Sequence, residues 1–79
     1  MGLETSKKSL HTQAKQRLGR NIKQLRLSSN LSQEELGLRI DADQAYISRL
    51  ERGLLNPTLE SVAEISQALG IDIKLLFAS

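Results

Sequence analysis

The chain has 79 residues, the size of a single domain, and its composition of 39% hydrophobic and 25% charged residues is typical of a globular protein. It contains no Cys and one His, which excludes a disulfide and a Cys or His metal cluster, and we expect no cofactor. No apolar run approaches the ~18 residues of a membrane span and none at the start has signal-peptide length, so we expect a cytoplasmic protein. The net charge is only +2, but residues 1–30 hold seven basic residues and one acidic residue, which indicates either a polyanion partner or a solvated helix face.

Residues 1–12 are polar and show no hydrophobic period, so we predict a flexible basic N-terminal arm in front of a domain that spans residues 13–79. Two roles stay open for this arm: Lys7 and Lys8 follow the phosphate backbone of a nucleic acid, or the arm is a tail that only favours solubility. The first helix of the domain begins at about Gln13 and ends at Ser28-Ser29-Asn30. Its apolar residues recur at the spacing of one helical face: Leu18, Ile22 and Leu25.

Two short helices joined by a three-residue turn follow. Ser32-Gln33-Glu34-Glu35 has the spacing of a capping box, which opens the first of them. The turn is Asp41-Ala42-Asp43, in which Asp41 tolerates the left-handed conformation and Asp43 can cap the next helix. That helix runs from Gln44 to about Arg52 and stops at Gly53.

The remaining chain predicts two more helices after the loop Leu54-Leu55-Asn56-Pro57. Thr58 caps a fourth helix that ends at Gly70, and Asp72 starts a short last helix. The inner residues of this last helix are Ile73, Leu76 and Phe77. The result is an all-α domain of five helices with no credible strand. Three apolar residues lie in the loop or on the outer side of the last helix: Leu54, Leu55 and Leu75. Two roles stay open for them: they form a dimer interface, or they only pack within the domain.

The helix that begins at Gln44 separates its side chains into two faces. At ~100° per residue, Ile47 and Leu50 turn toward the core. The opposite face is small, polar and basic, with Gln44, Ala45, Ser48, Arg49 and Arg52. A Gln amide fits the edge of adenine, an Arg guanidinium fits guanine and a small side chain fits the thymine methyl, so this face suits a DNA major groove. Such a face alone is more often merely solvated, but with the preceding short helix and turn it makes a helix-turn-helix pattern.

The segment from Leu31 to Gly53, LSQEELGLRIDADQAYISRLERG, closely resembles the helix-turn-helix of phage-repressor and Cro-type (XRE-like) regulators. The resemblance covers about residues 16–77. It implies a compact five-helix lambda-repressor-like fold and sequence-specific binding to double-stranded DNA, usually as a symmetric homodimer. Where the family usually has Gly in the turn, this chain has Asp41, which can take the same conformation at some cost.

The resemblance also implies roles for individual residues. The base-reading positions fall on Gln44, Ala45, Ser48 and Arg49. The positions that meet the DNA backbone fall on Gln33, Arg52 and Asn56, and a helical wheel sets Tyr46 where it can touch the backbone too. Arg26 and Glu51 match positions that pair with each other, and the wheel puts Glu51 half inside, so we expect a partly buried ion pair.

These observations favour a cytoplasmic, non-enzymatic transcriptional regulator that binds a palindromic operator as a dimer, such as a restriction–modification controller or a phage-type repressor. The alternative is a protein-interaction module, an antitoxin or an adaptor, whose main partner is another protein. The face with Gln44, Ser48 and Arg49 discriminates between the two, because an adaptor does not need it to be small, polar and basic.

Overall fold

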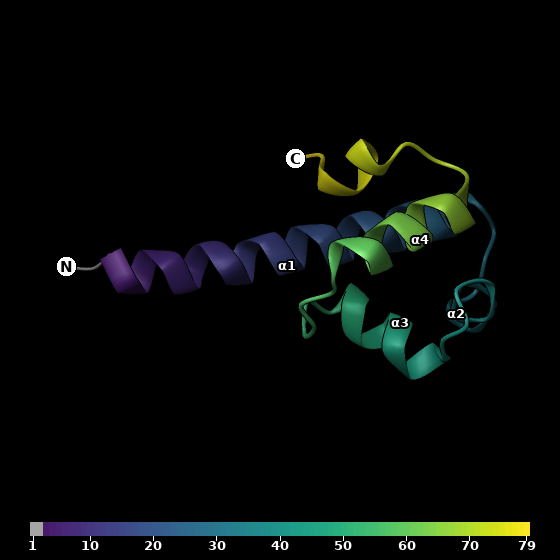
Figure 1. Cartoon of the computed structure of the whole chain (residues 1–79), viewed down its shortest axis with the longest axis horizontal. Helices are drawn as coiled ribbons and strands as arrows, with labels where there is room; N and C mark the ends of the chain where they lie inside the picture. Colours follow the sequence, from purple (N-terminus) through teal and green to yellow (C-terminus); the bar gives the residue numbers. More distant parts are fainter. Residues whose placement is uncertain (1–2) are drawn as a thin grey trace.

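In the computed structural model, the backbone is described for residues 3–79 and the side chains for residues 9–79. Four α-helices and a terminal 3₁₀ helix follow one another, and no strand occurs within this range: α1 (Leu3–Ser28), α2 (Gln33–Arg39), α3 (Gln44–Glu51), α4 (Leu59–Leu69) and η1 (Ile73–Phe77). The later elements gather around the C-terminal half of α1, and the N-terminal half of α1 projects beyond them (Figure 1).

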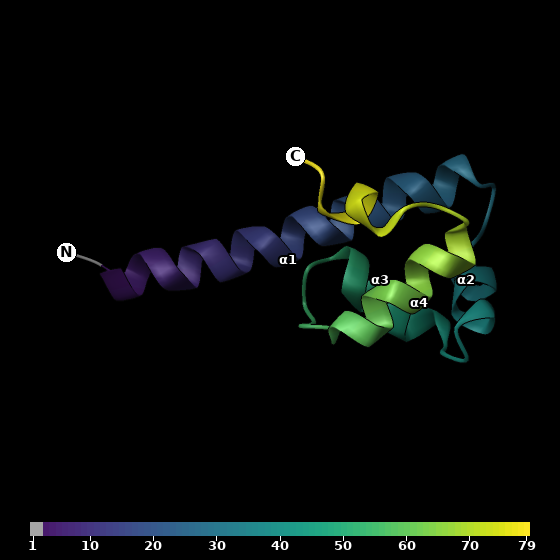
Figure 2. The same ribbon diagram turned by 45° about the horizontal axis from the view of Figure 1, so that its top comes forward.

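Helix α1 begins earlier than the apolar pattern predicted. The expected start was about Gln13, but the structure continues the helix back to Leu3. The part of α1 that packs on the core is already helical, and adding residues to an existing helix costs little where neither Pro nor Gly intervenes. Figure 2 shows the extension standing away from the other helices. The side chains of Lys7 and Lys8 lie outside the described residues, and the division into arm and domain stays a prediction.

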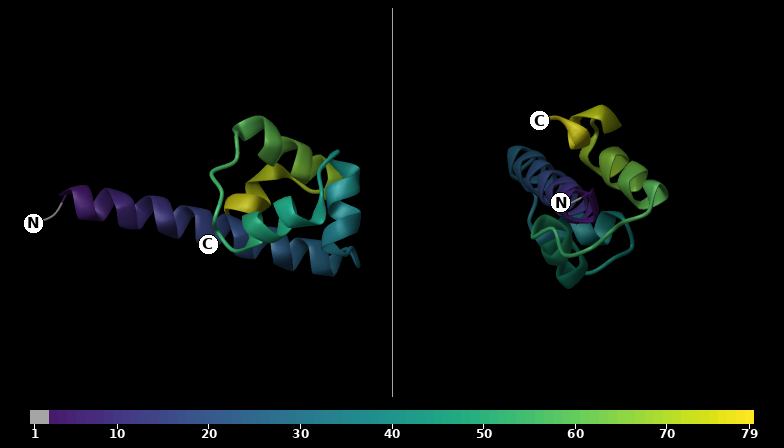
Figure 3. Two further views of the ribbon diagram at one scale, coloured as in Figure 1. Left: turned by 90° about the horizontal axis from the view of Figure 1, so that it is seen from below. Right: turned by 90° about the vertical axis from the view of Figure 1, so that its left-hand side faces the viewer.

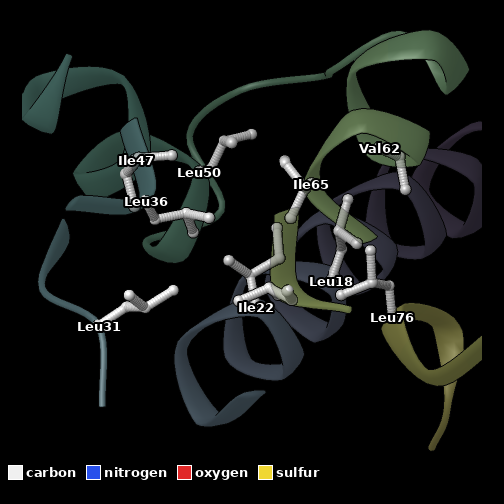
Figure 4. Packing of buried hydrophobic residues seen from close by; sticks show 10 residues of the cluster. Leu18, Ile22, Leu31, Leu36, Ile47, Leu50, Val62, Ile65 and Leu76 are labelled. Carbon is white, nitrogen blue, oxygen red and sulfur yellow. The ribbon is translucent and has the colours of Figure 1, made fainter. Parts of the chain in front are cut away.

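The core is aliphatic and draws on every element. Ile22 of α1, Leu36 of α2, Ile47 of α3 and Ile65 of α4 are fully buried and meet in the middle of the domain (Figure 4). Burying a side chain of this size contributes ~1.5–3 kcal/mol, so this cluster is what holds the short helices together. Within the described part of the chain, no helix is long and apolar enough to cross a membrane.

The predicted helix boundaries around the turn are confirmed. Ser32 accepts a hydrogen bond from the Glu35 amide at 3.0 Å and its own amide donates to Glu35 Oε1 at 2.8 Å, which completes the capping box. Asp41 has φ of 60°, the left-handed conformation expected there. Asp43 caps α3 by accepting from the Tyr46 amide at 2.8 Å. These contacts fix where α2 and α3 begin.

The last helix differs from the expectation in one of its inner residues. It is a 3₁₀ helix, η1, which repeats every three residues. Leu76 therefore lies above Ile73 and is fully buried, but Phe77 is turned outward and is 51% exposed. The Asn21 side chain of α1 holds this end in place, because its amide donates to the carbonyls of Leu76 at 2.9 Å and of Ala78 at 2.7 Å.

Candidate nucleic-acid interface

Helix α3 is embedded by one face only. Ile47 and Leu50 are 0% and 2% exposed, and Gln44, Ala45 and Arg49 on the other side are exposed. The left view of Figure 3 shows α3 at the surface of the domain, with no other helix over it. The polar, basic face expected from the sequence is therefore open to a partner.

The C-terminal end of α3 lies directly against α1. A Cβ atom added at Gly19 would lie 2.5 Å from the Leu50 carbonyl oxygen and 2.6 Å from that of Glu51, so only glycine fits this crossing. The backbone of the longest helix thus supports the helix that carries the outward face. Such support keeps the exposed side chains of α3 in a fixed position relative to the domain.

An ion pair also joins α1 to the C-terminal end of α3. Arg26 Nε donates to Glu51 Oε2 at 2.6 Å and Arg26 Nη2 donates to Glu51 Oε1 at 3.0 Å, a two-pronged contact. The side chains are 7% and 3% exposed. Arg26 Nη1 also donates to the Leu31 carbonyl at 2.8 Å. The two residues that were expected to pair are therefore in contact, and more deeply buried than the sequence suggested.

The buried pair connects to the surface through two glutamines. Gln33 Nε2 of α2 donates to Glu51 Oε1 at 3.0 Å, and Gln44 Nε2 donates to Gln33 Oε1 at 3.3 Å. The residue expected at a phosphate and the residue expected at a base therefore touch each other. The sequence carried no signal for this contact, because the two positions lie on different helices. A continuous series of hydrogen bonds from Glu51 therefore positions the side-chain amides of Gln33 and Gln44.

The other residues expected to contact the DNA backbone, and the base-reading candidate Ser48, differ in their exposure. Arg52 is exposed and its Nε donates to the Ser48 carbonyl at 3.3 Å, and Asn56 is exposed in the loop that follows α3. Ser48 itself is half-buried. Tyr46 is also half-buried and packs against the core, so it is more inward than the wheel predicted.

The three apolar residues expected at a dimer interface also differ in exposure. Leu54 is 59% exposed and Leu75 is 41% exposed, so both can meet a partner. Leu55 is half-buried and packs against the domain's own core. Leu54 and Leu75 are therefore the stronger candidates.

The electrostatics of α2 reinforce its cap. The hydrogen bond from the Ser32 amide, together with that from the Ser32 side chain, lowers the pKa of the Glu35 carboxyl, and Arg39 adds to the effect. Glu35 is thus held as a carboxylate at the helix N-terminus, where a negative charge is favourable. Among the described residues, no group of three or more side chains is suited to hold a metal ion.

A capped helix, a left-handed turn and a second helix with an open polar face define a helix-turn-helix DNA-binding domain. Residues 22–76 match the family model described as Helix-turn-helix. The chain belongs to this family, and it is a non-enzymatic DNA-binding transcriptional regulator of the Cro/C1 type.

Three similar proteins carry related names. Control protein C.BamHI of Bacillus amyloliquefaciens is 46% identical over 57 residues, which are 71% of this chain and 70% of that protein. Control protein C.MunI of Mycoplasma sp. is 40% identical over 63 residues, which are 78% of this chain and 85% of that protein. The crystal structure of the restriction-modification controller protein C.AhdI from Aeromonas hydrophila superposes with a TM-score of 0.81 at 31% identity, and the match covers 85% of this chain and 97% of that one.

Proposed function

We propose that this chain controls restriction–modification genes by binding a palindromic operator as a homodimer in the cytoplasm. The observation that carries the proposal is the open face of α3, with Gln44, Ala45 and Arg49 exposed on a helix whose opposite face is buried through Ile47 and Leu50. The similarity to C.AhdI, C.BamHI and C.MunI supports the controller role over that of a phage-type repressor.

In this proposal α3 lies in the major groove and reads base edges. The Gln44 amide binds the N6 and N7 atoms of adenine, and the Arg49 guanidinium binds O6 and N7 of guanine. Ala45 and the half-buried Ser48 contribute close apolar or single hydrogen-bond contacts, because both are small enough for the helix to approach. Specificity therefore rests mainly on Gln44 and Arg49.

Contacts to phosphate set the register of the domain on DNA. Gln33 is held by Glu51 at the N-terminus of α2, and Arg52 and Asn56 extend from the end of α3 and the loop after it. These groups lie at both ends of α3, so they can contact the phosphate backbones on both sides of the groove that the helix enters. Phosphate contacts carry no sequence information themselves, but they fix which bases the helix can reach.

Dimerisation through Leu54 and Leu75 would place the two recognition helices on half-sites about one helical turn apart. A two-fold dimer of this kind reads an inverted repeat, since each copy presents the same face to its own half-site.

In vitro selection of bound DNA from a random pool tests the proposal. We expect an inverted repeat whose half-sites are centred ~34 Å apart, and we expect the same repeat when selection is repeated at a higher salt concentration. A pool that shows no enrichment over the input at both salt concentrations would refute sequence-specific binding. An enriched single site without symmetry would refute the dimer.

A further inference from the structure

A hollow lies beside the loop that follows α3, outside the helix-turn-helix motif. It has a volume of about 320 Å³ and is lined by His11, Ala14 and Lys15 of α1 and by Asn56 of the loop. Residues that carry an ammonium, an imidazole and an amide therefore border the same hollow, and no carboxylate lines it. All of these groups can donate hydrogen bonds to an anion.

The hollow exists because the loop lies directly on α1. A Cβ atom added at Gly53 would lie 3.0 Å from Gln16 Cγ, so the chain leaving α3 touches α1 where that helix emerges from the domain. His11 and Lys15 precede this contact and are four residues apart, which puts them on neighbouring turns of one helix face. Figures 1 and 2 show the extension of α1 continuing past this loop.

We propose that this hollow binds a phosphate group of the DNA backbone, which adds α1 to the DNA-contacting surface. The Lys15 ammonium provides the charge, and the Asn56 amide and the His11 ring provide hydrogen bonds from the two sides. The inference rests on DNA binding through α3, since it is the exposed loop after α3 that brings Asn56 to the duplex.

Two features support a phosphate as the occupant. The basic residues are concentrated in residues 1–30, and α1 carries that charge past the end of the α3–α4 loop. In addition, His11, Ala14 and Lys15 precede residues 22–76, so the match to the family does not assign them a role. The contact would therefore involve a part of α1 that precedes the residues matched by the family model.

The salt dependence of DNA binding tests the assignment. For wild-type and Lys15→Ala protein, the association constant for the selected operator and for random DNA is measured over a series of KCl concentrations. Loss of one phosphate contact should make the slope of log K against log salt less steep by about 0.9 on both DNAs. Lys15→Arg should keep the wild-type slope. Asn56→Ala should weaken binding with the slope unchanged, because the amide is uncharged.

Arg17→Ala is the matched control, because Arg17 is exposed on the same helix and does not line the hollow. Its slope should equal that of the wild type. Equal slopes for Lys15→Ala and the wild type, or equal changes for Lys15→Ala and Arg17→Ala, would overturn the phosphate site. A change in the monomer–dimer equilibrium of Lys15→Ala at unchanged slope would also overturn it, in favour of a second copy at this surface. None of these results would affect sequence preference at α3, which the random-pool selection tests separately.

Discussion

Replacing Arg26 with Ala tests the most deeply buried polar contact of the domain. The substitution removes two hydrogen bonds to the Glu51 carboxylate and one to the Leu31 carbonyl. The Glu51 side chain is only 3% exposed, so its carboxylate loses its counter-charge at a buried position, and of its hydrogen bonds only the one from Gln33 remains. A buried charge without its counter-charge is much less stable than an exposed one.

The expected loss follows from this burial. Breaking a buried ion pair by removing one partner costs about 3–5 kcal/mol, whereas an exposed pair contributes about 0–1 kcal/mol. A domain of 79 residues has a total stability of ~4–12 kcal/mol. Arg26→Ala should therefore remove a large share of the free energy of unfolding, and at the low end of that range the variant should be largely unfolded.

Urea unfolding at fixed protein concentration measures the effect. With an m-value of ~1.5 kcal/mol/M, the midpoint should fall by about 2–3 M. The control is the double variant Arg26→Met with Glu51→Leu, which removes both charges at similar volume and should recover most of the loss. A loss below about 1 kcal/mol for Arg26→Ala would refute the reasoning, because the pair would then behave like one at the surface.

Three further predictions concern the helix crossing, the cap of α2 and the turn between α2 and α3. Gly19→Ala should destabilise the domain by ~1–3 kcal/mol in thermal unfolding, although Ala favours helix, because its Cβ would meet the Leu50 carbonyl oxygen at 2.5 Å; an unchanged midpoint would contradict the close crossing. Ser32→Ala should raise the pKa of Glu35 part of the way toward its ordinary value in an NMR titration, because the hydroxyl is lost and the backbone amide at position 32 still donates, and an unchanged pKa would show that the hydroxyl does not help to hold the carboxylate. Since the pKa of Glu35 is lowered in the folded protein, the cap stabilises the wild type above the unfolded-state pKa, and this contribution is lost as the pH falls through the folded-state pKa. Asp41→Gly should raise stability by up to ~1 kcal/mol, because glycine adopts φ of 60° without strain, and a lower melting temperature would argue against stored strain in this turn.

The sequence predicted the turn and the caps well because those features depend on neighbouring residues. Ser32, Asp41, Asp43 and Thr58 each act within a few positions of themselves, so their side-chain chemistry was sufficient to locate the ends of the helices. The two faces of α3 followed from helical periodicity in the same way.

Features that depend on distant residues were not predictable. The contacts of Gln33 with Gln44 and Glu51 arise from packing of α2 against α3, and the inward position of Tyr46 depends on what the core leaves open. The orientation of Phe77 depends on η1 being a 3₁₀ helix, whose shorter repeat the apolar pattern of so short a segment does not distinguish from an α-helix. The start of α1 at Leu3 was not predictable because the residues before Gln13 show no apolar pattern that would indicate a helix.

The most direct test of the base-reading account compares Arg49→Ala with wild-type protein on the selected operator and on a scrambled duplex of the same length. Arg49 is exposed on α3, and an Arg guanidinium can bind O6 and N7 of guanine. The account predicts a loss of ~1–3 kcal/mol on the operator, a relaxed preference at one base pair of each half-site, and a much smaller loss on the scrambled duplex. Arg49→Ala weakening both duplexes equally, with base preferences unchanged, would contradict it.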